Sequence, residues 1–225
     1  WSDIRERAEN LGAAIVGAMR KIELANPDTL YGVLSMFSAQ KWTDKANLSD
    51  SKIRDLIEHL STRRLGNNDY PTDLMGDAYE ILLKKFADDS KAQAGEFYTP
   101  RAVTDFMAQR IKPKIGETMA DFACGTGGFI TSWLKELQKQ VRSTADAEKY
   151  GNSIYGIEKK QFPYMLCITN LLLHGLDIPR VYHDNSLLKD VLDYTVDDQF
   201  DVILMNPPYG GNEKQDVKNH FPSDL

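Results

Sequence analysis

Apolar side chains recur at helical spacing through the first ninety residues of the chain. The first run alternates spacings of four and three residues and stops at Pro27. Because residues three and four apart share one face of a helix, the run predicts a single amphipathic helix from Ile4 to Ile22. Its members are Ile4, Ala8, Leu11, Ile15, Ala18 and Ile22.

Two further helices are predicted in this part of the chain. The segment "LSDSKIRDLIEHL" (48–60) places its apolar residues on one face, with Ser49 or Ser51 as the N-cap. The segment "PTDLMGDAYEILLKKFADD" (71–89) predicts a third helix, with Thr72 or Asp73 as the N-cap. No residue pattern in these helices indicates catalysis. We therefore expect residues 1–94 to form a helical domain that serves packing, assembly with a partner or DNA contact.

The pattern changes after residue 90, where short β-like runs begin to alternate with apolar helical runs. Strands are predicted at 118–122, 153–158, 180–183 and 200–205, and helices at 129–141 and 162–173. Strand–helix alternation is typical of a parallel sheet covered by helices. We therefore expect an α/β domain over residues 95–225.

Each predicted strand ends in a polar or glycine-rich group. In parallel sheets, ligands bind at the carboxyl ends of the strands, so these four groups predict one shared pocket. They are the turn Cys124-Gly125-Thr126-Gly127-Gly128, then Glu158, then Asp184, and finally Asn206-Pro207-Pro208-Tyr209.

Carboxylates stand at three of these strand ends, and each has two readings. Asp121, before the glycine turn "CGTGGF", can accept hydrogen bonds from a ligand ammonium or can brace the turn. Glu158 can bind both hydroxyls of a ribose or can be a solvated strand end. Asp184 can accept from an adenine amino group or can simply form a turn. The glycines let a ligand approach the backbone, although they do not match the dinucleotide pattern G-x-G-x-x-G.

The segment "VILMNPPYGG" ends a buried strand abruptly. Pro207 and Pro208 have no N–H and cannot continue a sheet ladder. The chain must leave the sheet in a stiff turn, which holds the amide of Asn206 and the ring of Tyr209 at the strand end. A bare turn would have the same pattern.

Upstream, "GEFYTPRAV" predicts a helix with Thr99 as N-cap and Pro100 as its first residue. Capping does not explain why Phe97 and Tyr98 precede it. An apolar stripe is expected on this helix, formed by Val103, Phe106, Met107 and Ile111.

Composition narrows the function classes. The net charge of −6 over 225 residues argues against a broad basic surface and against strong DNA binding by the chain alone. The four histidines show no metal-ligand spacing, so no metal site is expected. Cys124 and Cys167 lie in apolar or glycine-rich stretches, which favours a reduced, cytosolic protein without disulfides. The apolar stretches are far shorter than the roughly 20 residues of a membrane span, so no membrane association is expected.

Taken together, these motifs resemble the N6-adenine DNA methyltransferases, most closely the modification subunits of type I restriction–modification systems. The resemblance covers most of the chain: the helical N-terminal part, "AGEFYTPRAV", "DFACGTGGF", "YGIE", "HDNSL" and "NPPY". It implies a Rossmann-like sheet that uses S-adenosyl-L-methionine. "NPPY" alone is shared with methyltransferases that act on protein glutamine or on RNA, whereas "GEFYTPR" before the glycine turn is more specific.

The resemblance also implies roles for individual residues. The methionine end of the cofactor would be bound by the segment of Thr99, by Asp121 and by the glycine turn, its ribose by Glu158 and its adenine by Asp184. Asn206 and the carbonyl of Pro207 would accept the two hydrogens of the target amino group, and Tyr209 would stack on the flipped base. The full set implied for the cofactor is Glu96, Phe97, Tyr98, Thr99, Pro100, Asp121, Gly125, Thr126, Gly127, Gly128, Phe129, Glu158 and Asp184, and for catalysis Asn206, Pro207, Pro208 and Tyr209.

The same resemblance implies partners: DNA, a specificity subunit, a restriction subunit and a second copy of the chain, in the cytoplasm of a bacterium or archaeon. Two alternatives stay open, a protein-glutamine or RNA methyltransferase and a non-catalytic subunit that only binds the cofactor. The strand "VILM" is apolar on both faces, as in the centre of a sheet, so further strands are expected beside it. We therefore expect the chain to be truncated at its C-terminus, and the missing initial Met indicates a longer gene.

Overall fold

The computed structural model of the chain describes residues 2–7, 9–30, 32–35, 39–63, 72–89, 98–210 and 212–221. By internal contacts the chain divides into two compact units, Trp1–Thr72 and Asp73–Leu225. The helix α6 (Thr72–Asp89) thus has its contacts in the second unit. The functional division between residues 94 and 95 stays a prediction.

The first unit is helical, as its pattern predicts, but its first helix is not continuous. The chain forms a short helix, α1, and a longer one, α2, with Asn10 between them in the left-handed conformation at φ 58°. The cause is Asp50, a residue distant in sequence. Its two carboxylate oxygens each accept a hydrogen bond of 3.0 Å, from the backbone N–H groups of Asn10 and Leu11. The single helix predicted from Ile4 to Ile22 is therefore wrong. The helices of this unit are α1 (Ser2–Arg5), α2 (Leu11–Ala25), α3 (Pro27–Leu30), α4 (Ala39–Thr43) and α5 (Asp50–Ser61).

The N-cap of α5 is confirmed, because the Ser49 hydroxyl accepts a hydrogen bond from the backbone N–H of Lys52. Leu11, Ile53 and Ile57 form the buried centre of this unit. The side chains of Thr72 and Asp73, the alternative caps of α6, lie outside the described residues.

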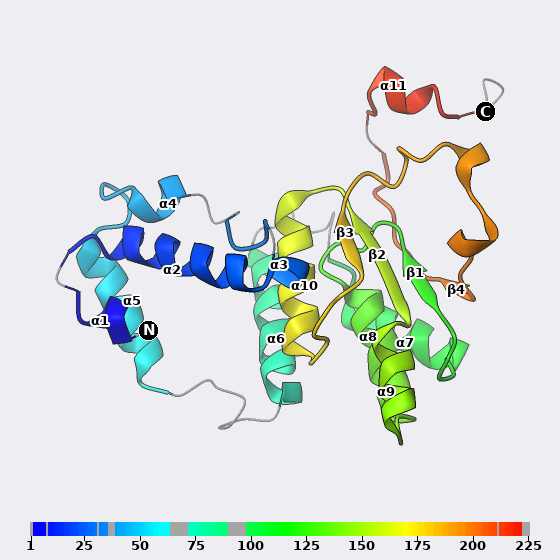
Figure 1. The fold of residues 1–225 in the computed structure, drawn as a ribbon, viewed down its shortest axis with the longest axis horizontal. Helices are drawn as coiled ribbons and strands as arrows, with labels where there is room; N and C mark the ends of the chain where they lie inside the picture. The colour runs from blue at the N-terminus through cyan, green and yellow to red at the C-terminus, as the bar shows by residue number, and fades with distance from the viewer. Residues whose placement is uncertain are drawn as a thin grey trace. The chain divides into compact units, whose positions relative to one another are not determined.

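The second unit contains the predicted parallel sheet (Figure 1). Its strands are β1 (Met119–Asp121), β2 (Ile154–Glu158), β3 (Val181–His183) and β4 (Val202–Ile203), in the order β3-β2-β1-β4. All three pairs of neighbouring strands are parallel, with Met119 beside Ile154 on one side and beside Val202 on the other. In the described sheet β4 is an edge strand, and Ile203 is 55% exposed.

Helices cover one face of this sheet. Gly156 on β2 leaves room there for α8 (Gly128–Gln138), because a Cβ on this glycine would lie 3.1 Å from Cδ1 of Ile130. Successive strand residues point to opposite faces, so Tyr155 faces the other side. Its ring packs there with those of Tyr182 and Phe200, at centroid distances of 5.3 and 5.1 Å.

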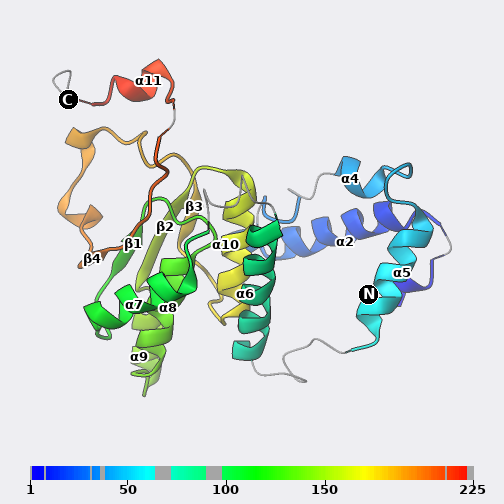
Figure 2. The same ribbon diagram turned by 180° about the vertical axis from the view of Figure 1, so that it is seen from behind.

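The other helices of the unit are α7 (Arg101–Ile111), α9 (Thr144–Gly151), α10 (Gln161–Leu173) and α11 (Gln215–Lys218), with 3-10 turns at Val191–Asp193 and Val196–Asp198. Figures 1 and 2 show α6 alongside α10 from both sides, and the Tyr79 hydroxyl on α6 donates to the carbonyl of Leu166 on α10 at 3.5 Å. In the part of the chain that is described, no helix combines the length and apolar character needed to cross a membrane.

The apolar stripe predicted on α7 is not buried. Val103, Phe106 and Ile111 are exposed, Phe106 to 62%, while Thr104 and Ala108 are buried. The stripe is therefore an exposed face of the helix, and α7 turns toward α8 a face that includes polar contacts. The Ser132 hydroxyl bridges the Thr104 hydroxyl and the Asp105 carboxylate at 2.8 and 2.6 Å.

Candidate functional site

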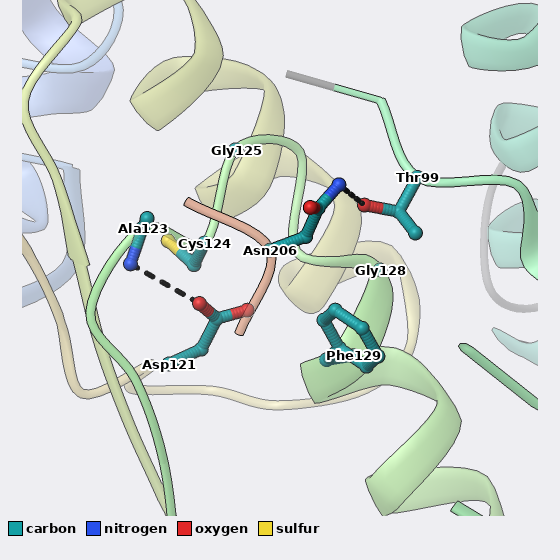
Figure 3. Close-up of a pocket in the computed structure, with 8 residues that line it drawn as sticks. All are labelled: Thr99, Asp121, Ala123, Cys124, Gly125, Gly128, Phe129 and Asn206. Carbon is teal, nitrogen blue, oxygen red and sulfur yellow. Dashed lines mark hydrogen bonds between the residues drawn. The ribbon is translucent and has the colours of Figure 1, made fainter. Parts of the chain in front are cut away.

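Two cavities open where the strands end, and they share Ala123 and Asn206. The smaller one lies beside the glycine turn (Figure 3) and is lined by Thr99, Asp121, Ala123, Cys124, Gly125, Gly128, Phe129 and Asn206. The larger one has a volume of about 380 Å³. Its lining residues are Phe122, Ala123, Glu158, Lys159, Lys160, Asn185, Ser186, Leu187, Met205, Asn206, Pro207, Pro208, Gly210 and Glu213.

Asp121 is the buried acid of the smaller cavity. Its side chain is 1% exposed and accepts one hydrogen bond, from the backbone N–H of Ala123 at 3.1 Å (Figure 3). Burial raises the pKa of Asp121 to about 7; the Ala123 N–H opposes the rise and the negative charge of Glu158 adds to it. A carboxyl group held in this way is stabilised in its charged form when a cation enters, so the site fits a ligand ammonium.

The glycine turn is shaped largely by the protein's own packing. Gly127 has φ 81°, and a Cβ there would lie 2.8 Å from Sγ of Cys167. A Cβ on Gly128 would lie 1.9 Å from Nη1 of Arg101. These two positions therefore exclude a side chain before any ligand is considered. Ligand approach to the turn stays a prediction.

Glu158 joins the turn to the larger cavity. Its carboxylate accepts hydrogen bonds from the backbone N–H of Gly125 at 2.9 Å and of Lys160 at 2.7 Å, one on each oxygen. Each carboxylate oxygen has a further lone pair. The residue is 9% exposed and lines the larger cavity, so both oxygens can accept from a ligand that carries two adjacent hydroxyls.

Asn206 lies between the two cavities. Its Nδ2 donates to the hydroxyl of Thr99 at 3.3 Å, and its Oδ1 accepts from the hydroxyl of Tyr209 at 3.4 Å. Thr99 is not the N-cap of α7, as its sequence position predicts, because the helix begins at Arg101 and Pro100 holds the cap position without a side-chain bond. The hydroxyl of Thr99 binds the asparagine instead.

The structure places nine of the predicted site residues in the walls of these cavities: Thr99, Asp121, Gly125, Gly128, Phe129, Glu158, Asn206, Pro207 and Pro208. Five others, Tyr98, Pro100, Thr126, Gly127 and Tyr209, line neither cavity, and Tyr209 is 99% exposed. Glu96 and Phe97 lie outside the described residues.

Asp184 also lines neither cavity. Its exposed carboxylate accepts from the backbone N–H of Asn185 at 2.7 Å. The next two residues, Asn185 and Ser186, reach the larger cavity in its place. A role for Asp184 in adenine binding stays a prediction.

Sequence reasoning missed Glu213. Its carboxylate forms an ion pair with Nζ of Lys159 and accepts from Nδ2 of Asn185 at 3.2 Å. These bonds lower the pKa of Glu213, chiefly through Lys159, and tie the segment after Pro208 to β2 and β3. No local pattern marks Glu213, because its position depends on contacts with Lys159 and Asn185, which lie 54 and 28 residues earlier in the sequence.

Comparison with known proteins identifies a family and several relatives that this chain resembles. The sequence profile of the N-6 DNA methylase family matches residues 70–223. The methylase subunit of the type I restriction enzyme EcoEI from Escherichia coli is 47% identical over 154 residues, 68% of this chain and 31% of that protein. The MjaIX methylase subunit of Methanocaldococcus jannaschii is 31% identical over 208 residues, 91% of this chain and 34% of that protein.

Among solved structures, one described as the modification subunit of a type I restriction enzyme from Vibrio vulnificus YJ016 matches with a TM-score of 0.66 and 37% identity. The match covers 77% of this chain and 36% of that one. The chain thus spans about a third of the length of these relatives.

Proposed function

The chain belongs to the N-6 DNA methylase family, and we propose that it transfers a methyl group from S-adenosylmethionine to the N6 amino group of adenine in DNA. In this proposal it acts as part of the modification subunit of a type I restriction–modification system. The observation that carries the proposal is the position of Asn206, which lines both of the cavities that we assign to the cofactor and stands at the start of the segment 206–209 that we assign to the target base.

The residues present fit the cofactor. Asp121 offers a buried carboxylate to its ammonium group, and Glu158 offers two oxygens to its ribose hydroxyls. The larger cavity has apolar walls for a purine ring, from Phe122, Leu187 and Met205. When bound, S-adenosylmethionine supplies an electrophilic methyl group.

The segment 206–209 suits the target base. The amino group of adenine is a weak nucleophile because its lone pair is delocalised into the ring. Oδ1 of Asn206 and the carbonyl of Pro207 can accept its two hydrogens, which localises the lone pair on the nitrogen. The ring of Tyr209 is almost fully exposed and is available to stack on a base that has left the duplex.

The partners belong to the proposal as well. Base-specific readout needs side chains placed against base edges, and a net charge of −6 disfavours tight contact with the phosphate backbone. We propose that a specificity subunit supplies DNA readout, in a cytoplasmic complex that also contains a restriction subunit and a second copy of the modification subunit.

The test is methyl transfer by the full chain, with and without the specificity subunit encoded nearby, using labelled S-adenosylmethionine. Mass spectrometry of the DNA nucleosides should find label in N6-methyladenine when both proteins are present. An Asn206→Ala variant serves as the inactive control. Label in glutamine or RNA, or none in any assembly, contradicts the proposal. Tight sequence-selective DNA binding by the chain alone contradicts the assigned role of the specificity subunit.

A further inference from the structure

A buried carboxylate on α6, that of Glu80, is linked through other side chains to two parts of the smaller cavity. These parts are the Thr99 segment and the glycine turn. Glu80 is 9% exposed, and its two oxygens have different partners. Oε2 forms an ion pair with Nε of Arg101, and Oε1 accepts from Nδ2 of Asn170 at 2.7 Å. Glu80 therefore connects α6 to the start of α7 and to the middle of α10.

The ion pair with Arg101 connects Glu80 to the segment that contains Thr99. Arg101 follows Thr99 by two residues, and its guanidinium lies 5.2 Å from the ring centroid of Tyr98. The same group fills the space beside Gly128, where a Cβ would meet Nη1. Nη1 and Nη2 are buried and have no hydrogen-bond partner in the described part of the chain, so the position of this cation depends strongly on Glu80.

The Asn170 branch leads to the glycine turn. Asn170 is fully buried, and its Nδ2 also donates to the carbonyl of Thr126 at 3.1 Å. Thr126 stands in the turn between Gly125 and Gly127. One amide group thus holds the turn and the Glu80 carboxylate together.

We propose that Glu80 is a positioning residue for the cofactor site, because one carboxylate fixes both the Thr99 segment and the glycine turn. This inference rests on the proposed function, since it takes the smaller cavity as the place of the methionine end. Glu80 does not line either cavity, so it is assigned no direct contact with the cofactor. It acts through Arg101 and Asn170. A displacement of Arg101 would move the Thr99 segment, and a displacement of Asn170 would move the glycine turn.

A purely structural role is the alternative, and cofactor affinity separates the two. Glu80→Gln keeps the shape of the side chain and an acceptor oxygen but removes the negative charge beside Arg101. The matched control is Asp77→Asn, one turn earlier on α6, which removes the exposed ion pair of Asp77 with Lys135 at 3.3 Å. Both variants lose an ion pair of α6, but only Glu80→Gln loses one that leads to the site.

The experiment measures the affinity of the full chain for S-adenosylmethionine by calorimetry, and thermal unfolding in parallel. Glu80→Gln should weaken binding about tenfold or more, and Asp77→Asn less than twofold. In the assembled complex, Glu80→Gln should raise KM for S-adenosylmethionine by a larger factor than it lowers kcat, since the Asn206 side chain is unchanged and only its bond to Thr99 is exposed to the shift. Asn170→Ala, which cuts only the branch to the turn, should weaken binding by a smaller factor and replaces Glu80→Gln if that variant does not fold.

Three outcomes overturn the inference. The first is a Glu80→Gln or Asn170→Ala protein that melts earlier but binds the cofactor as tightly as the parent, because Glu80 is then structural only. The second is equal weakening by Asp77→Asn, because any loss on α6 would then have the same effect. The third is a parent chain that is folded but binds no S-adenosylmethionine, which defeats the proposed function and this inference with it.

Discussion

The hydroxyl of Thr99 accepts a hydrogen bond from Nδ2 of Asn206 at 3.3 Å, across 107 residues of sequence. With Nδ2 toward Thr99, Oδ1 lies on the other side of the amide, where it accepts from Tyr209. An amide that is to accept hydrogens from a target amine needs this orientation. In the proposed function, Thr99 therefore supports Asn206 at the target base as well as the predicted cofactor site.

Thr99→Val keeps the size of the side chain and removes the hydroxyl. Since a neutral hydrogen bond contributes about 0.5–1.5 kcal/mol, kcat for adenine methylation should fall roughly 2- to 12-fold. Thr99→Ser keeps the hydroxyl and should stay close to the parent. Steady-state kinetics at saturating cofactor measures the effect, and an unchanged kcat in Thr99→Val contradicts the role given to Thr99.

Cofactor affinity should depend on pH through Asp121, whose pKa burial raises to about 7. Only the ionised carboxylate attracts the ammonium group, so affinity should rise as pH increases through 7. Between pH 5.5 and 7.5 the increase should be roughly tenfold or more, as expected for one proton released on binding. Calorimetry over this range in Asp121→Asn is the control, and that variant should bind weakly with no pH dependence. A parent chain with a flat profile refutes the assignment.

The same acid should make the protein less stable at alkaline pH. The folded chain keeps the proton of Asp121 up to about pH 7, whereas the unfolded chain releases it near its ordinary pKa of about 4. The stabilising contribution of the protonated form is complete below pH 4 and is lost as pH rises through 7.

Asp121→Asn should therefore raise the free energy of unfolding at pH 8, by roughly 1–3 kcal/mol. Asparagine keeps an acceptor for the Ala123 N–H and carries no charge to bury. Denaturant unfolding at pH 5 and pH 8 measures the difference, which should be smaller at pH 5. An Asp121→Asn chain that is less stable than the parent at pH 8 shows that the carboxylate is satisfied when charged.

Alanine substitutions of Asn206 and Glu158 should affect methyl transfer and cofactor binding separately. Asn206→Ala should abolish methylation and leave the affinity for S-adenosylmethionine nearly unchanged, because the amide is assigned to the target amine. Glu158→Ala should weaken cofactor binding first, because it removes the ribose acceptor and a bond to the turn at Gly125. Calorimetric titration compares the two. Equal loss of cofactor affinity in both would mean that the division of roles is wrong.

The strand ends could be predicted from sequence because they depend on local signals. A β-like run followed by a polar or glycine-rich group marks each one, and the parallel order brings these groups to one edge. Thus the sequence alone predicts that Asp121, Glu158 and Asn206 lie at the strand ends, and all three line the cavities.

The features that were missed depend on residues far apart in sequence. Asp50 breaks the helix before Leu11, Ser132 binds the polar face of α7, and Glu213 forms an ion pair with Lys159, 54 residues earlier. In each case one side chain satisfies polar groups more than 20 residues away, and a periodic pattern carries no information about such a bond. The one-residue shift at Thr99 has the same origin, since its hydroxyl is taken by Asn206.

Within the described residues β4 is an edge strand, and this gives Pro207 and Pro208 a second consequence. An unpaired strand edge is a template on which another chain can add a strand, and an exposed apolar side chain such as Ile203 favours that addition. Pro207 and Pro208 follow the end of this short strand after three residues, and because they have no N–H groups they deprive an incoming strand of donors where it would extend. Residues suited to holding a base thus also oppose self-association, and replacing both prolines should promote aggregation even in a chain whose helices and cavities are unchanged.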